Sequence, residues 1–397
     1  MRPYKITQIF PYFLFFDFQT FPSSTFFLST SIHKFAMSSF LSELRTTASR
    51  ITSSSKLKTS EEVKKRKTRR SGYEVVKTSY TSLPVPIPND FLKPLKNPDE
   101  VITVEKIDFG KTVLKEYRGA YAVVLDGVLS REECGVLVRL AEMSKGGHGN
   151  VVEGIEVNNG VKVTGSEEVE KEDGEDEEVK GPANNGWTPA MVNAGIGHEF
   201  LATEYRNSDR IIWDEKEVVG RIWKRVLQGK GINEDIGVLE GQKWEGLATL
   251  GLRSGERWVG TEQGINERMR FLRYGAGQYF REHTDGCYET PDGSERSFFT
   301  IHLYLNDSAQ ELEKNPNTPK FSKDSEMLRG GATTFHSRDM KERLDVDPKV
   351  GRVLIFQHRR LLHSGDDVVA GVKYTMRSDL MFRFEDGLAG EGEVVFG

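Results

Sequence analysis

Hydrophobic positions follow a helical period in two segments between residues 134 and 227, and they form a series of short strand-like runs after residue 265. Residues 134–143 and 214–227 carry apolar side chains at helical spacing, and each segment predicts an amphipathic helix. Ser130 and Glu133 predict a capping box before the first helix, because the serine can accept from the amide three residues on while the glutamate reaches back. Strands are predicted at residues 121–126, 269–274, 297–305, 331–335, 352–356 and 374–382.

This order of elements predicts an α+β fold. We expect a double-stranded β-helix (jelly roll) whose N-terminal helices pack on one sheet. Residues 265–387 form the predicted core, and residues 101–264 form a supporting region of helix and strand. Within that region, residues 146–186 are rich in glycine and then in acidic side chains, which predicts a mobile surface insertion.

The first hundred residues lack sustained periodicity and predict a disordered or targeting tail that ends in a proline-rich linker. The basic run at residues 64–70 fits either a nuclear import signal or a solvated tail. Residues 1–36 fit a signal peptide poorly because Pro11 interrupts the apolar run. Their Ser and Thr content fits an organelle transit segment, but arginine is scarce. A start at Met37 is the third alternative. We expect a cytoplasmic or nuclear protein, with organelle or secretory targeting by residues 1–36 left open.

Composition places few limits on the partners. With 55 basic and 60 acidic side chains, the net charge of -5 neither requires nor excludes nucleic acid. The basic run lacks the interleaved aromatic residues of a nucleic-acid site, so no clear site of that kind is predicted. Cys134 and Cys287 do not form a disulfide framework, and a reducing compartment fits best. The longest apolar runs are shorter than the roughly eighteen residues of a transmembrane helix, so no transmembrane segment is predicted.

Two histidines and a carboxylate are the candidate metal ligands. His283 and Asp285 are two residues apart, so both side chains leave the same face of a strand. A pair of this kind is expected by chance and carries little weight alone. His363 follows a distant predicted strand and supplies the third ligand that one strand cannot provide. Two imidazoles and one carboxylate are the set that holds non-haem iron(II) and leaves positions open for reactants.

Four segments in this order resemble the prolyl 4-hydroxylase branch of the iron(II)/2-oxoglutarate dioxygenases. Residues 274–285 match the pattern Tyr-x-x-Gly-Gln-x-(Tyr/Phe)-x-x-His-x-Asp, and residues 330–335 match a Gly-Gly-x-Thr-x-Phe strand with one residue of slack. Residues 348–356 match a Pro-x-x-Gly-x-x-Leu-x-Phe strand. The last segment is His363 with Gly371 and Lys373 eight and ten residues later. The likeness covers residues 265–387 well and 115–265 loosely.

The resemblance implies iron(II) as cofactor, 2-oxoglutarate and dioxygen as co-substrates, and ascorbate as reductant. It places Lys373 against the distal carboxylate of 2-oxoglutarate, because a buried carboxylate needs a cation. Arg377 lies four residues further along the same predicted strand face and is the rival anchor. Tyr274 and Tyr304 match positions whose hydroxyls contact the co-substrate.

Three further residues are predicted near the site. Thr300 and His302 alternate with Tyr304, so we expect them to line the same face, although His302 also fits a hydrogen-bonded core position. Cys287 lies two residues beyond Asp285 and is expected near the mouth of the site. His336 and His358 are interpreted as surface or strand residues.

The function predicted from this resemblance is hydroxylation of a C–H group, with decarboxylation of 2-oxoglutarate to succinate. A protein side chain such as proline is the expected substrate, on the resemblance alone. The same chemistry on a small molecule or a nucleobase is the first alternative. A non-catalytic jelly-roll interaction module is the second, and the presence of all three ligands argues against it.

Overall fold

The computed structural model describes residues 69–70, 73–146, 185–195, 197–247, 256–322 and 326–386. The predictions for residues 1–68 lie outside this part of the chain, as does almost all of the acidic insertion. No helix in the described part is long and apolar enough to cross a membrane.

The described helices are short, and the two longest, α3 (Arg131–Met143) and α4 (Lys216–Val226), contribute most of the buried helical side chains. The other helices are α2 (Pro98–Val101), α5 (Ile232–Ile236) and α6 (Ala309–Leu312), with 3-10 turns η1 (Phe109–Lys111), η2 (Lys115–Tyr117) and η3 (Gln242–Trp244). The capping box predicted at Ser130 and Glu133 is confirmed at the start of α3. The second helix begins two residues later than predicted because Glu215 caps it by accepting from the amide of Glu217.

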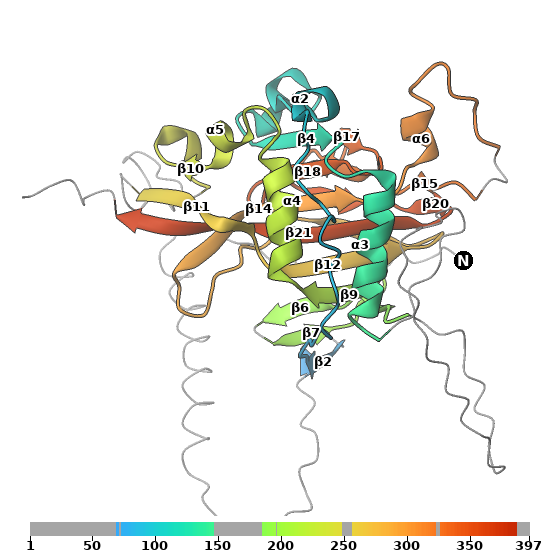
Figure 1. Cartoon of the computed structure of the whole chain (residues 1–397), viewed down its shortest axis with the longest axis horizontal. Helices are drawn as coiled ribbons and strands as arrows, with labels where there is room; N and C mark the ends of the chain where they lie inside the picture. The colour runs from blue at the N-terminus through green and yellow to red at the C-terminus, as the bar shows by residue number, and fades with distance from the viewer. Residues whose placement is uncertain are drawn as a thin grey trace, which may run out of the picture. The chain divides into compact units, whose positions relative to one another are not determined.

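Antiparallel strands make up most of the regular secondary structure in the described residues, in agreement with a jelly-roll arrangement (Figure 1). The large sheet contains, in spatial order, β3 (Thr103–Lys106), β4 (Ala122–Asp126), β18 (Val353–Gln357), β14 (Glu295–Tyr304), β21 (Lys373–Asp386), β12 (Arg268–Tyr274), β9 (Asp209–Asp214) and β5 (Thr188–Pro189); β11 (Glu256–Ile265) joins the far end of β21 and pairs with β10 (Val238–Leu239). The second sheet contains β17 (Arg343–Val346), β16 (Thr333–His336), β19 (His363–Gly365), β13 (Tyr279–His283) and β8 (Arg206–Asn207).

Two smaller pairings complete the described strands. One sheet contains β1 (Arg69–Arg70), β2 (Tyr73–Lys77), β7 (His198–Phe200) and β6 (Val192–Gly195), and a two-stranded pair contains β15 (Arg329–Gly330) and β20 (Val368–Ala370). The large sheet draws strands from both the predicted supporting region and the predicted core. These two regions therefore share one sheet, and the boundary predicted at residue 265 does not separate two structural units.

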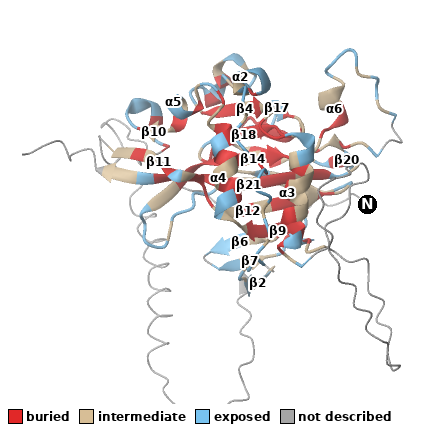
Figure 2. Ribbon diagram, in the orientation of Figure 1, coloured by how far each residue is buried: buried red, intermediate tan, exposed pale blue. Residues whose placement is uncertain are grey.

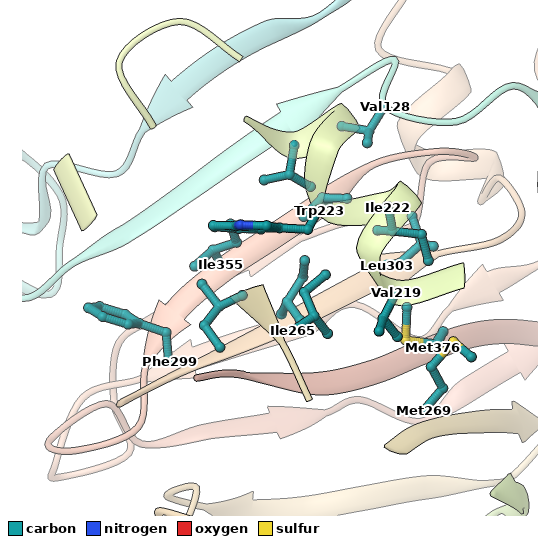
Figure 3. Close-up of a cluster of buried hydrophobic side chains, with 14 of the residues drawn as sticks. Val128, Val219, Ile222, Trp223, Ile265, Met269, Phe299, Leu303, Ile355 and Met376 are labelled. Carbon is teal, nitrogen blue, oxygen red and sulfur yellow. The ribbon is translucent and has the colours of Figure 1, made fainter. Parts of the chain in front are cut away.

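Alternation along β14 divides the core into two layers. Phe299, Ile301 and Leu303 belong to the cluster that includes the buried faces of α3 and α4. Figure 3 shows Ile222 and Trp223 of α4 over the strands that carry Leu303 and Ile355. Tyr304 points to the other face of the large sheet and belongs to a cluster with side chains of the second sheet. Burial is concentrated along these central strands (Figure 2), and the candidate site lies in the second layer.

Part of the predicted N-terminal linker is packed against the core. β2 pairs with β7, and Phe91 and Leu92 are buried. Arg221 of α4 donates to the carbonyls of Pro88 and Phe91, at 2.9 and 2.6 Å. Prolines leave this segment few amides for a regular pairing, so side chains of α4 bind its carbonyls instead. The interpretation of residues 73–100 as a free linker is therefore wrong.

Candidate metal centre

The three predicted ligands converge at the end of β13. His283 lies directly opposite His363 in the pairing of β13 with β19, and Asp285 follows β13 by two residues. Nε2 of His283 lies 3.7 Å from Oδ1 of Asp285, and Nε2 of His363 lies 3.6 Å from Oδ2. One ligand atom from each side chain falls within 4.8 Å of the others, which leaves room for one ion between them.

Backbone carbonyls fix the orientation of both imidazoles. Nδ1 of His283 lies 2.7 Å from the carbonyl of Arg281, and Nδ1 of His363 lies 3.1 Å from the carbonyl of Leu361. A proton on each Nδ1 leaves the Nε2 lone pairs facing Asp285, as metal ligands require. Burial, followed by the nearby His363, lowers the pKa of His283 to about 3, and burial also lowers the pKa of His363. Both rings are therefore held neutral, which is the form that binds a metal.

Asp285 is held as a carboxylate by two donors. Thr300 donates to Oδ2, and Nη2 of Arg377 lies 2.8 Å from Oδ1. Burial alone would raise the pKa of Asp285, but Arg377 and the two imidazoles outweigh burial and hold it well below its usual range. The donor set of two neutral nitrogens and one carboxylate oxygen fits iron(II) and leaves further positions for reactants.

The two candidate anchors for 2-oxoglutarate have different surroundings. Arg377 is paired with Asp285 and lies 3.6 Å from Asp379. Lys373 is 2% exposed, and its ammonium lies over the rings of Tyr274 and Tyr304, at 5.2 and 5.8 Å from their centres. Among the described residues, no carboxylate lies within 4 Å of that ammonium. Lys373 is therefore the cation left available for an incoming anion.

Gly331 makes space for the stem of Lys373. The predicted strand at residues 331–335 begins only at Thr333, because Gly330 and Gly331 have φ values of 73° and 72°, a region that favours glycine. A Cβ atom on Gly331 would lie 3.1 Å from Cδ of Lys373. The pair of glycines in the predicted motif thus serves both the backbone turn and the lysine.

The two tyrosines border the lysine from the large sheet. Tyr304 is fully buried, and its hydroxyl donates to Oγ1 of Thr333 at 2.7 Å. Tyr274 is 4% exposed and lies opposite Lys373 in the pairing of β12 with β21. Burial raises the pKa of both hydroxyls, so each remains a neutral donor at physiological pH.

His302 and Cys287 are the remaining residues that the sequence predicts near the site. The ring of His302 lies 4.8 Å from that of Tyr304, and its Nε2 is buried without a hydrogen-bond partner among the described residues. Burial, followed by Lys373 and Arg377, holds the pKa of His302 well below its usual range. The alternative of a hydrogen-bonded core histidine therefore does not describe this Nε2. Cys287 is exposed just beyond the ligands.

Two other histidines, interpreted from the sequence as surface or strand residues, are both buried, and His336 is the one that lies in a strand. His358 is completely buried and its Nε2 lies 3.5 Å from Asp379, so a surface position is wrong for it. His336 is a buried residue of β16, and its Nε2 lies 2.8 Å from Oγ of Ser364.

Sequence reasoning missed two residues beside the ligands. The ring of Phe280 stacks on His283, with 3.8 Å between centres and an interplanar angle of 26°. Cζ of Arg206 lies 4.6 Å from the centre of the Phe280 ring. Phe280 was within a predicted motif without an assigned role. Arg206 lies 77 positions before His283 in a stretch without periodicity, and only the pairing of β8 with β13 brings it to the site.

Comparisons with known proteins bear on the same segment. A family model described as the 2OG-Fe(II) oxygenase superfamily matches residues 269–378, which include all three ligands. No curated protein matches the chain significantly. Similar solved structures include a prolyl-4-hydroxylase from Pseudomonas putida (16% identity, 50% of this chain, 77% of that chain, TM-score 0.29), the viral collagen prolyl hydroxylase of Paramecium Bursaria Chlorella virus-1 (20%, 45%, 80%, 0.27) and a prolyl hydroxylase from Trichoplax adhaerens bound to a hypoxia inducible factor peptide fragment (15%, 52%, 75%, 0.28). Identities and TM-scores at this level assign no substrate to the chain.

Proposed function

Residues 269–378 belong to the 2OG-Fe(II) oxygenase superfamily. From this premise we propose that the chain is an iron(II)- and 2-oxoglutarate-dependent hydroxylase. Its proposed substrate is a protein side chain, with proline as the first candidate. The observation that carries the proposal is the combination of three converging ligands with one buried, unpaired lysine. A metal site alone would serve many functions. The lysine beside it supplies the second contact that a chelating dicarboxylate needs.

The chain's own residues position the reactants. His283, Asp285 and His363 would hold iron(II), which when bound supplies the activation of dioxygen coupled to decarboxylation of 2-oxoglutarate. Lys373 would pair with the distal carboxylate, and its ammonium lies over the rings of Tyr274 and Tyr304. Ascorbate belongs to the proposal as the reductant.

Supporting residues keep the ligands in place. Thr300 and Arg377 orient the carboxylate of Asp285, so the ligand does not rotate away from the imidazoles. The ring of Phe280 stacks on one face of His283. These contacts exist without substrate and would preorganise the site.

The substrate part of the proposal has two supports. The four motifs resemble the prolyl 4-hydroxylase branch in order and spacing. The chain is also exposed at Thr284 and from Gly286 to Glu289, directly beyond His283, so the site opens to the surface where a large substrate can approach.

Succinate release tests the proposal. The purified chain with iron(II), ascorbate and 2-oxoglutarate is incubated with proline-containing peptides, and products are examined by mass spectrometry for the gain of one oxygen. His283→Ala is expected to abolish succinate release, whereas His198→Ala on exposed β7 is expected to preserve it. Turnover retained in His283→Ala would refute the site. Turnover without an oxidised peptide would refute the protein substrate and leave the reaction class standing.

A further inference from the structure

A buried arginine without an anionic partner lies one aromatic ring away from His283. Arg206 is 9% exposed, and its Nε has no hydrogen-bond partner within the described structure. In the same part of the chain, no carboxylate lies within 4 Å of its guanidinium. Its Cζ lies over the ring of Phe280, whose ring stacks on His283. Arg206 is therefore held beside the metal ligands with its charge uncompensated.

Neighbouring arginines differ from Arg206 in this respect. Arg210 is paired with Glu199 at 3.0 Å, and it also donates to Tyr80. Arg270 lies 3.2 Å from Asp379, and Arg377 is engaged by Asp285. Each of these three has a carboxylate in place before any ligand arrives.

Burying the unpaired guanidinium of Arg206 costs free energy that a bound anion would offset. Removing an ion from water is expensive, and the loss is recovered only by a nearby opposite charge with good hydrogen bonds. The contact with Phe280 recovers part of it, since a cation over an aromatic face is weaker than a paired carboxylate. The like charges of Arg210 and Arg377 further disfavour the charged form of Arg206. An anion at Arg206 would remove this imbalance.

The proposed co-substrate does not provide that anion. One carboxylate of 2-oxoglutarate would chelate the metal together with the keto oxygen, and the other would pair with Lys373. Neither carboxylate remains for Arg206. The uncompensated guanidinium of Arg206 is therefore available to the substrate that is hydroxylated.

We infer that the hydroxylated substrate carries a carboxylate that binds Arg206, so that the enzyme selects an acidic group next to the C–H that reacts. This inference rests on the proposed function, since it names the substrate class of the same site. A planar guanidinium binds a carboxylate through two parallel hydrogen bonds, which fixes orientation as well as affinity. Arg206 acts here as a specificity residue. β8 is the edge strand of the second sheet, so a substrate can reach it from that side.

The first arm of the test measures binding without turnover. The full chain is loaded with zinc(II) in place of iron(II) and saturated with 2-oxoglutarate, and acetate is titrated while its methyl proton relaxation is followed by NMR. Wild type and Arg268→Gln, which breaks a partly exposed pair with Asp214 on the large sheet, are expected to bind acetate alike. Arg206→Gln is expected to bind it at least tenfold more weakly. Equal binding by Arg206→Gln, or no binding by wild type, overturns the inference.

The second arm uses blocked peptides that carry Asp or Asn beside proline. Greater succinate release with the Asp peptide, lost in Arg206→Gln, supports the inference, and equal release with both peptides overturns it. If no peptide stimulates release while acetate binding still depends on Arg206, the anion site stands and the protein substrate of the proposed function fails. A tenfold loss of 2-oxoglutarate affinity in Arg206→Gln would make Arg206 a co-substrate anchor and overturn the inference. If circular dichroism shows that Arg206→Gln does not fold, Arg206→Lys replaces it. Arg206→Lys is expected to lose acetate binding and the preference for the Asp peptide to a smaller extent.

Discussion

The guanidinium of Arg377 lies 2.8 Å from a carboxylate oxygen of Asp285, whereas the ammonium of Lys373, four residues earlier on β21, faces two tyrosine rings. Two cations on one face of one strand therefore have different tasks. Arg377 is engaged by Asp285, and Lys373 is left as the proposed partner of the distal carboxylate of 2-oxoglutarate. Substitutions at the two positions are expected to separate metal binding from co-substrate binding.

Lys373→Ala is expected to raise the KM for 2-oxoglutarate by at least about 30-fold, because a buried charge pair is worth roughly 2 kcal/mol or more when one partner is removed. Arg377→Gln is expected to weaken iron(II) binding by roughly 10- to 100-fold, as losses beside a metal ligand do. Steady-state kinetics at saturating iron and an iron titration at saturating 2-oxoglutarate separate the two effects. A raised KM for 2-oxoglutarate in Arg377→Gln, with Lys373→Ala unaffected, would reverse the assignment.

Gly331→Ala is expected to raise the KM for 2-oxoglutarate by displacing the stem of Lys373. The added Cβ would lie 3.1 Å from Cδ of that lysine, and the φ of 72° adds strain of about 1 kcal/mol or more. Gly277→Ala is the matched control, since Gly277 has a φ of 77° and a Cβ added there would meet nothing within 4 Å. Both variants should lose stability in urea unfolding, and only Gly331→Ala should change the KM. An equal change in KM would show that backbone strain alone is responsible.

We expect His358 to make the stability of the fold depend on pH. Burial lowers its pKa, but the carboxylate of Asp379 outweighs burial and raises the pKa to about 9. A folded pKa above the unfolded value of about 6.5 stabilises the fold fully below pH 6.5, and this contribution is lost as the pH rises through 9. The free energy of unfolding of wild type should exceed that of His358→Asn most at pH 6. The gap should shrink by up to about 3 kcal/mol at pH 9.5. A gap that does not change with pH would contradict a charged His358.

His302→Leu is expected to stabilise the metal-free chain. The variant removes a buried Nε2 that lacks a hydrogen-bond partner in the described structure, and an unsatisfied buried group costs about 1 to 3 kcal/mol. Urea unfolding of the metal-free wild type and variant measures the difference. Ser130→Ala, which removes the capping box of α3, provides a reference in the opposite direction, with an expected loss of about 1 kcal/mol. A less stable His302→Leu would indicate that His302 has a structural role in the folded chain.

Local chemistry explains which elements the sequence predicts well. Ser130 and Glu133 cap α3 as expected, because a capping box depends on four consecutive residues. The second helix and the main strands were also predicted, with ends shifted by a few residues. The sequence does not predict the packing of residues 88–95 on α4 and on the turn after it, because carbonyls bound by Arg221 and Gln228 leave no periodic pattern in the proline-rich segment.

Sequence alone predicts the candidate ligand set, since His283, Asp285 and His363 are recognisable by type, spacing and the strands between them, and residues 269–378 match the model of the 2OG-Fe(II) oxygenase superfamily. Which charged side chains around those ligands pair with one another, and which stay unpaired, depends on the folded chain. Pairing of β14, β21 and β13 with their neighbours places Arg377 on Asp285, leaves Lys373 unpaired and brings Arg206 over Phe280. Groups distant in the chain decide whether a buried charge is satisfied, and no local pattern of residues reports those distances.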